Sequence, residues 1–183
     1  MKINHRVIQC LILLAVASAT YAGPLSAKAQ TAVYSTLIFT NRETSEANQN
    51  QYFADSGVEA GFYHEGYRIG HFSNGFDVRG SFSANDKFLL GGFRTEILSR
   101  KEILRPYFEF LLGPGSTRNI QDVPKGHLFY EYVGGIDCPM GHIDFRVLEL
   151  GIGKTLLNNS VGTDYTGGNL WETTASSGVV YRF

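Results

Sequence analysis

The stretch from Thr174 to Phe183 constrains the fold of this chain more than any other. Successive side chains of a β-strand point to opposite sides, so Val179, Tyr181 and Phe183 share one face. That face is apolar and aromatic, whereas the other face carries the charge of Arg182. A strand of this kind belongs to a sheet that separates an apolar environment from a polar one.

Residues 1–29 have the features of a secretory signal peptide. A basic start is followed by an apolar segment over residues 7–16, and small residues then lead to the A-x-A pattern Ala27-Lys28-Ala29. The apolar segment is too short to cross a bilayer as a helix. We therefore expect cleavage after Ala29 and a mature domain over residues 30–183.

Composition narrows the function classes. The chain has 183 residues, enough for one domain with a sizeable interior, and its net charge of −1 gives no indication of a nucleic-acid partner. Cys138 is the only cysteine after the signal peptide, so an internal disulfide is excluded. Histidines and cysteines lack the spacing of metal ligands, and no cofactor is expected.

The mature chain alternates between apolar and polar residues in eight segments, and none of it has a convincing helical period. Strands are predicted over residues 31–39, 57–64, 67–82, 87–97, 105–112, 127–137, 142–154 and 171–183. The third of these contains Asn74-Gly75, which predicts an interruption.

The connections between these strands differ in length at alternate positions. Long polar loops are predicted over residues 40–56, 113–126 and 155–170, whereas Glu65-Gly66 and residues 138–141 predict tight turns. In an up-and-down barrel all three long loops would lie at one end. This asymmetry and the even strand count are typical of transmembrane barrels. We therefore predict an eight-stranded antiparallel up-and-down transmembrane β-barrel.

Alternation alone would also fit a soluble calyx with an apolar interior. The basic residues favour the membrane barrel, because lysines after the signal peptide lie at strand ends or in connections whereas arginines lie inside strands. Arginine suits buried pairing with carboxylates, and a lipid-facing arginine or lysine costs about 2–4 kcal/mol at the bilayer midplane. A lumen charge network is therefore predicted from Asp77, Arg79, Arg94, Glu96, Glu109, Glu131, Asp144, Arg146 and Arg182.

Glu149 does not follow this alternation. It falls on the apolar face of its strand, which predicts either a β-bulge near Leu148 or a different strand register.

The signal peptide, the eight predicted strands and the terminal GVVYRF sequence together resemble small bacterial outer-membrane barrels of the OmpA/OmpX/Opa type. The resemblance implies residence in the outer membrane of a Gram-negative-type bacterium. It further implies contact with outer-membrane lipid and lipopolysaccharide, a monomeric state and an assembly signal in Val179, Tyr181 and Phe183 that barrel-assembly machinery reads. An eight-stranded lumen is filled by side chains, which argues against a diffusion porin.

One local motif suggests a different activity. His71-Phe72-Ser73-Asn74 resembles the H-x-S-N motif of lipid A deacylase barrels, in which histidine acts as base and serine as nucleophile. Its spacing would put His71 and Ser73 on one strand face. A purely structural alternative is that these residues form a bulge or turn at Asn74-Gly75.

Three functions remain open at this stage. The first is a non-enzymatic barrel with an envelope-structural or surface-interaction role, in which the outer loops meet an unidentified extracellular ligand. The second is a lipid A deacylase-like hydrolase that uses His71 and Ser73. The third is a soluble periplasmic calyx that binds a small apolar ligand.

Overall fold

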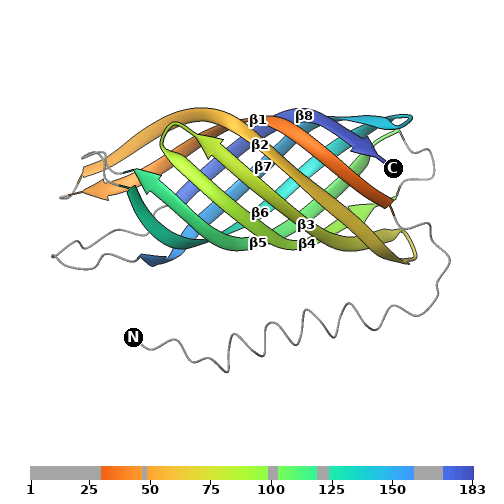
Figure 1. Cartoon of the computed structure of the whole chain (residues 1–183), viewed down its shortest axis with the longest axis horizontal. Coiled ribbons are helices and arrows are strands. Elements are labelled where there is room, and N and C mark those ends of the chain that lie inside the picture. The colour runs from red at the N-terminus through yellow and green to blue at the C-terminus, as the bar shows by residue number, and fades with distance from the viewer. Residues whose placement is uncertain (1–29, 47–48, 99–102, 119–123, 159–170) are drawn as a thin grey trace, which may run out of the picture.

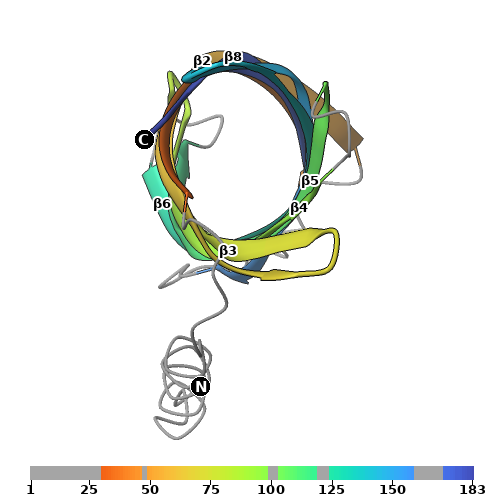
Figure 2. The ribbon, with the colours of Figure 1, turned by 90° about the vertical axis from the view of Figure 1, so that its right-hand side faces the viewer.

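The computed structural model describes residues 30–46, 49–98, 103–118, 124–158 and 171–183. These residues form a closed barrel in which each strand pairs antiparallel with the next and β8 pairs with β1 (Figure 1, Figure 2). The strands are β1 (Gln30–Glu46), β2 (Gln49–Ile69), β3 (Phe72–Ser83), β4 (Asp86–Ile97), β5 (Arg105–Arg118), β6 (Pro124–Met140), β7 (Ile143–Asn158) and β8 (Trp171–Arg182). The predicted architecture is confirmed.

The predicted loop over residues 40–56 is wrong for most of its length. β1 continues to Glu46 and β2 begins at Gln49, with their backbones paired throughout. The sequence here is polar at nearly every position, so it lacks the apolar alternation by which a strand is recognised. A hairpin needs only main-chain pairing, which polar residues in water also provide. The predicted loops over residues 113–126 and 155–170 are shortened in the same way by β5, β6 and β7.

The tight turn predicted at Glu65-Gly66 is also wrong. β2 runs on to Ile69, with a register shift between Glu65 and Tyr67, and the turn lies at residues 70–71, where Gly70 has a φ of 60°. β3 is not interrupted at Gly75. A side chain at Gly75 would overlap the backbone of His64 on β2, so this glycine permits a close approach of two strands.

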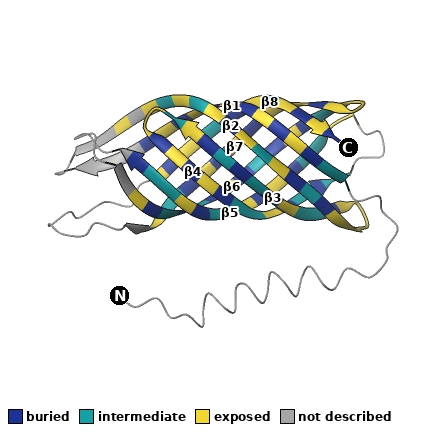
Figure 3. Cartoon of the chain, viewed as in Figure 1, coloured by how far each residue is buried: buried dark blue, intermediate teal, exposed yellow. Residues whose placement is uncertain are grey.

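Where the side chains are described, inward and outward positions alternate along the strands except at the register shifts (Figure 3). The predicted bulge near Leu148 is present, because the pairing of β7 with β8 shifts between Arg146 and Glu149. Val147 and Leu148 both lie on the outer surface, and Glu149 therefore returns to the interior.

The outer surface of the barrel is apolar. Large hydrophobic side chains such as Leu37, Phe93 and Phe108 are exposed on the outside of the barrel. Charged side chains occupy the interior. The soluble calyx would need the reverse arrangement and is excluded. An apolar outer belt around a polar interior is the pattern of a transmembrane barrel.

The two ends of the barrel differ. One end, called the turn end, holds the turns at residues 70–71 and 141–142 together with Phe183. The other, the ribbon end, holds the turn at residues 84–85, the end of β1 and the start of β2, which extend to the left in Figure 1. No helix among the described residues is long and apolar enough to cross a membrane.

Phe93 lies near the middle of β4 and faces outward, with 59% of its surface exposed. Phe93→Arg should lower the free energy of unfolding by about 2–4 kcal/mol, since the guanidinium would face lipid. Urea unfolding in lipid vesicles measures the effect. Phe93→Leu and Tyr52→Arg are the matched controls and should change little, because Leu is apolar and Tyr52 lies on the hairpin at the ribbon end. Equal stability of Phe93→Arg and Phe93→Leu would contradict the lipid-facing assignment.

Candidate functional site

Alternating arginine and tyrosine side chains fill the barrel interior. Each arginine Cζ lies 3.7–5.5 Å from the centroid of at least one tyrosine ring, within the range of cation–π contact. In order of contact, the members of this arginine–tyrosine column are Arg182, Tyr63, Arg94, Tyr107, Arg146, Tyr34 and Arg79. Every strand except β6 contributes one of them. The column therefore links strands that are far apart around the barrel wall.

Arg94 lies at the centre of the column and is almost fully buried. Its Nη1 donates to Glu109 Oε1 at 2.5 Å, and its Nη2 donates to Asp137 Oδ2 at 3.1 Å and to Glu96 Oε2 at 3.3 Å. A buried guanidinium is tolerated only when its charge is paired and its N–H groups are satisfied. Carboxylates from β4, β5 and β6 pair the charge and accept hydrogen bonds from both Nη atoms, and Glu65 lies 3.7 Å from Nε.

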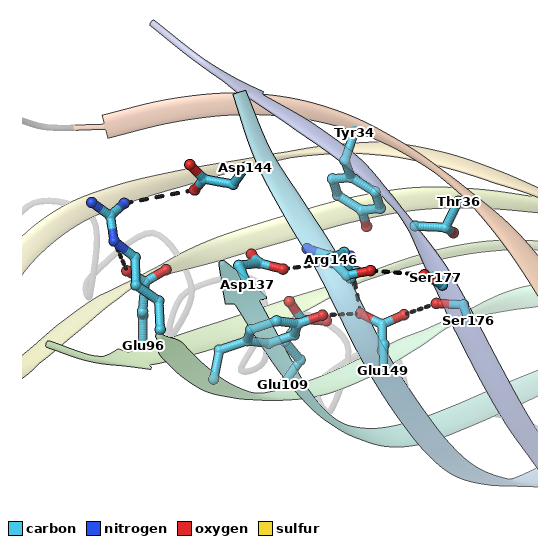
Figure 4. Close-up of polar contacts among 12 residues, drawn as sticks. Tyr34, Thr36, Glu96, Glu109, Asp137, Asp144, Arg146, Glu149, Ser176 and Ser177 are labelled. Atoms are coloured by element: carbon cyan, nitrogen blue, oxygen red, sulfur yellow. Dashed lines mark hydrogen bonds and ion pairs between the residues drawn. The ribbon is translucent and has the colours of Figure 1, made fainter. Parts of the chain in front are cut away.

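Arg146 links the carboxylates around Arg94 with those around Arg79, because it pairs with one carboxylate of each group. Its Nε donates to Asp137 Oδ1 at 3.1 Å and its Nη1 donates to Glu149 Oε2 at 3.0 Å (Figure 4). Tyr107 and Ser176 also donate to Glu149, at 2.5 Å and 3.0 Å. The bulge in β7 is what brings the Glu149 carboxylate into the lumen.

Arg79 and Arg182 occupy the two ends of the column. Arg79 pairs with Asp77 at 3.1 Å, with Glu59 at 3.2 Å, with Glu149 at 3.0 Å and with Glu109. Arg182, near the turn end, pairs with Asp144 and, at 3.1 Å, with Glu96. Carboxylates therefore surround the column along its whole length.

The structure places every residue of the predicted lumen network inside the barrel, where each is buried. Glu131 Oε1 accepts a hydrogen bond at 2.7 Å from Thr174 Oγ1 on β8. Sequence reasoning counted Glu59 and Asp137 among the strand carboxylates, did not include Glu65, and put Glu149 on the apolar face unless a β-bulge intervened. It also missed the tyrosines, which a period-two pattern counts as apolar although their rings here stack on guanidinium groups.

Inward glycines make room for these large side chains. A Cβ at Gly135 would overlap the ring of Tyr107, and one at Gly61 would overlap the ring of Tyr34. In both cases the glycine is the direct pairing partner of the tyrosine on the neighbouring strand. The interior is thus filled by alternating small and large residues, as a narrow barrel requires.

The structure does not bring His71 and Ser73 together as a base and nucleophile. His71 lies in the exposed turn between β2 and β3, whereas Ser73 faces the interior and is buried. Ser73 Oγ donates to Glu65 Oε2 at 2.6 Å. The sequence prediction put both residues on one strand face because it did not foresee the turn at residues 70–71.

A polar cluster fixes the ribbon end. Asp55 Oδ2 accepts hydrogen bonds from Ser83 Oγ at 2.7 Å and from the backbone N of Asn85 at 3.0 Å. Partial burial disfavours the charged carboxylate, but the hydrogen bonds from Ser83, Asn85 and Ser56 lower the pKa of Asp55 below its ordinary value. Nearby, Arg42 forms an ion pair with Asp86. The turn at residues 84–85 is therefore fastened to the β1–β2 hairpin.

Among the described residues, no group of three or more His, Cys, Asp or Glu side chains has the arrangement of a metal site.

Similarity to known proteins is limited to solved structures. No protein-family model matches the chain, and no curated protein matches it. Neisserial surface protein A (NspA) is similar with 14% sequence identity over 83% of this chain and 99% of that chain, at a TM-score of 0.50. Ail of Yersinia pestis has 10% identity over 83% of this chain and 98% of that chain, at a TM-score of 0.46. The N-terminal β-barrel domain of Pseudomonas aeruginosa OprF has 12% identity over 85% of this chain and 100% of that chain, at a TM-score of 0.40.

The chain has the fold of a small eight-stranded outer-membrane β-barrel. In this outer-membrane barrel fold the closing strand is β8, and Val179 and Tyr181 on it and Phe183 directly after it all lie exposed on the outer surface. The backbone N of Phe183 donates to the carbonyl O of Thr31 on β1 at 2.9 Å. The end of β8 thus takes part in closing the barrel. Recognition of this end by barrel-assembly machinery stays a prediction.

Arg94→Met should destabilise the barrel by about 3–5 kcal/mol, because it leaves buried carboxylates without their cation. Adding Glu109→Gln should recover part of that loss, since one of those carboxylates becomes neutral. Urea unfolding in vesicles measures both variants. Arg68→Met, at an exposed arginine on β2, is the matched control and should have little effect. Because Glu109 also pairs with Arg79, Glu109→Gln alone completes a double-mutant cycle, and additive losses in that cycle would contradict the pairing of Arg94 with Glu109.

Gly135→Val should destabilise the barrel by roughly 1–3 kcal/mol through overpacking, because the new side chain displaces Tyr107 from Arg94 and Arg146. Gly126→Val is the matched control on the same strand, since no atom lies within 4 Å of a Cβ built there. Thermal unfolding in detergent compares the two. Equal midpoints would show that the column tolerates a shift of Tyr107.

Proposed function

We propose that this protein is an integral outer-membrane barrel that acts at the cell surface through its ribbon end. On this proposal, residues 1–29 direct export and are removed, and the barrel lies in the outer membrane of a Gram-negative-type bacterium. The ribbon end faces outward and the turn end faces the periplasm, as short periplasmic turns and longer outer loops are typical of such barrels. Its partners are outer-membrane lipid and lipopolysaccharide at the belt, and barrel-assembly machinery at Phe183.

The observation that carries this function is the contrast between a filled lumen and an extended outer end. Arg79, Arg94 and Arg146 are all nearly fully buried in mid-barrel, where their side chains occupy the interior. A lumen filled in this way favours anchoring over diffusion of solutes. The chain instead extends β1 and β2 beyond their pairing with β8 and β3. We accordingly place function on that extension and expect a monomeric barrel.

A hydrolase that uses Ser73 has less support. Its hydroxyl donates to Glu65 inside the charged lumen, and His71 lies in the exposed turn. The lipid A deacylase-like alternative would need a nucleophile next to its base. An envelope-structural role differs from the proposed one in requiring no ligand at the ribbon end, and the following experiment separates the two.

Cells that express the protein should adhere to immobilised serum protein or to epithelial monolayers more than cells that lack it. Replacing residues 44–51 by a short Asn-Gly turn should abolish that gain, because it removes the outer part of the β1–β2 hairpin while retaining the barrel. Retained cells are counted after washing. Phe93→Leu, a change in the belt, is the matched control and should adhere like the wild type.

Folding of the shortened variant is checked by its faster migration in detergent gels without heating. A folded, shortened barrel that still confers full adhesion would overturn the surface-interaction role and favour the envelope-structural one.

A further inference from the structure

Two buried carboxylates of the barrel interior have no arginine partner among the described residues. Glu131 and Glu172 are 5% and 3% exposed, and neither forms an ion pair with a described residue. Every other buried aspartate or glutamate in the described part of the chain forms at least one ion pair. Buried charges in proteins are paired or coordinate a metal ion. This pair of carboxylates therefore needs a counter-ion that the arginine–tyrosine column does not supply.

Strand register places the two carboxylates at the same level of the lumen. Glu131 on β6 pairs with Gly153 on β7, and Gly153 pairs in turn with Glu172 on β8. Neighbouring strands lie about 4.8 Å apart, so the two glutamate backbones are roughly 10 Å apart across β7. Side chains that point inward from a curved wall converge. Because the inward residues of β7 here are Gly151 and Gly153, no β7 side chain separates the two glutamates.

Hydroxyl groups lie next to these carboxylates. Thr174 Oγ1 donates to Glu131 Oε1 at 2.7 Å, and both oxygen atoms lie directly over Gly151, where a Cβ would overlap them. Thr40 on β1 pairs with Thr174, and its buried Oγ1 has no hydrogen-bond partner among the described residues. Oxygen atoms from β1, β6 and β8 thus face one part of the lumen, and carboxylate and hydroxyl oxygens are the ligands of hard cations.

The neighbouring side chains do not neutralise the pair. Arg42 is the pairing partner of Glu172 on β1, but its guanidinium forms its ion pair with Asp86 on β4. On the β5 side, Glu131 pairs with the apolar residue Leu111. Two ionised carboxylates carry two negative charges, which one divalent cation neutralises.

We propose that Glu131 and Glu172 hold a calcium ion in the lumen near the ribbon end, with the hydroxyl groups of Thr40 and Thr174 beside it and water as the remaining ligand. The site has two carboxylates, so it differs from the groups of three or more that the described residues lack. Calcium accepts about six to eight oxygen ligands in flexible geometry, whereas magnesium demands a near-ideal octahedron that ligands from separate strands do not readily provide. The bound ion would link β6 to β8 across β7. This inference goes beyond the proposed surface role and does not depend on it.

Calcium binding is measured by equilibrium dialysis of the mature protein in phosphatidylcholine nanodiscs, with empty nanodiscs as the blank. Chelator-treated protein should bind one calcium ion with a Kd on the order of 10⁻⁴–10⁻³ M, as sites with few carboxylates do. Glu131→Gln with Glu172→Gln should weaken binding at least about tenfold. Asp55→Asn is the matched control, since it removes a carboxylate at the same end that Ser83 and Asn85 already satisfy, and should bind calcium like the wild type.

Urea unfolding with calcium or with a chelator supplies a second readout. Calcium should raise the unfolding midpoint of the wild type and of Asp55→Asn, and should not raise that of Glu172→Gln. In chelator the order should reverse. Glu172→Gln should then unfold at a higher urea concentration than the wild type, because it removes a buried charge that lacks a partner.

A wild-type protein that binds no calcium, and whose midpoint calcium does not change, would overturn the proposal in favour of a protonated Glu172. Equal calcium binding by the wild type and the double glutamine variant would also overturn it, since the ion would then lie elsewhere. Tighter binding of magnesium than of calcium under the same conditions would overturn the assignment of the ion. The unheated gel migration of each variant confirms that it is folded.

Discussion

Burial of arginine inside a narrow barrel is the interaction on which the rest of this structure depends. Moving an ion out of water costs several kcal/mol even after relaxation, and only close pairing and satisfied N–H groups offset that cost. Each arginine of the column meets at least one carboxylate and one tyrosine ring. Because its members come from strands around the whole wall, the column stabilises the closed barrel as a unit.

The apolar outer surface of the barrel requires a polar interior. Lipid accepts apolar side chains of any shape, so the alternate positions of each strand must hold the polar residues. An eight-stranded barrel leaves just enough room for side chains, and large residues must therefore face small ones. Gly135 opposite Tyr107, and Gly61 against Tyr34, show that requirement at the level of single residues. The filled lumen in turn leaves the ends of the barrel as the surfaces available to partners.

The two ends have different chemistry. At the turn end, β2 and β3 are joined directly through Gly70, and Phe183 closes β8 against Thr31. At the ribbon end, the charged side chains of Arg42, Asp55 and Asp86 tie the turn at residues 84–85 to the hairpin. Farther out, β1 and β2 pair only with each other among the described residues. The proposed surface role rests on this extension of the hairpin.

The sequence by itself determined the strand number, the closed architecture and the inward direction of Arg79, Arg94, Arg146 and Arg182. These follow from period-two alternation, which is local and depends on the immediate neighbours of each residue. The out-of-phase position of Glu149 also predicted a bulge, because a strand in a two-sided environment cannot change face without one.

Only the tertiary structure decided which carboxylate meets which arginine. Asp137, for example, lies between Arg94 and Arg146 through the register of β6 with its neighbours, which no single strand encodes. The turn at residues 70–71, which holds His71 outside the strand that carries Ser73, and the length of the β1–β2 hairpin were decided in the same way. Strand pairing sets both, and in polar segments the side chains carry no apolar period from which that pairing could be read.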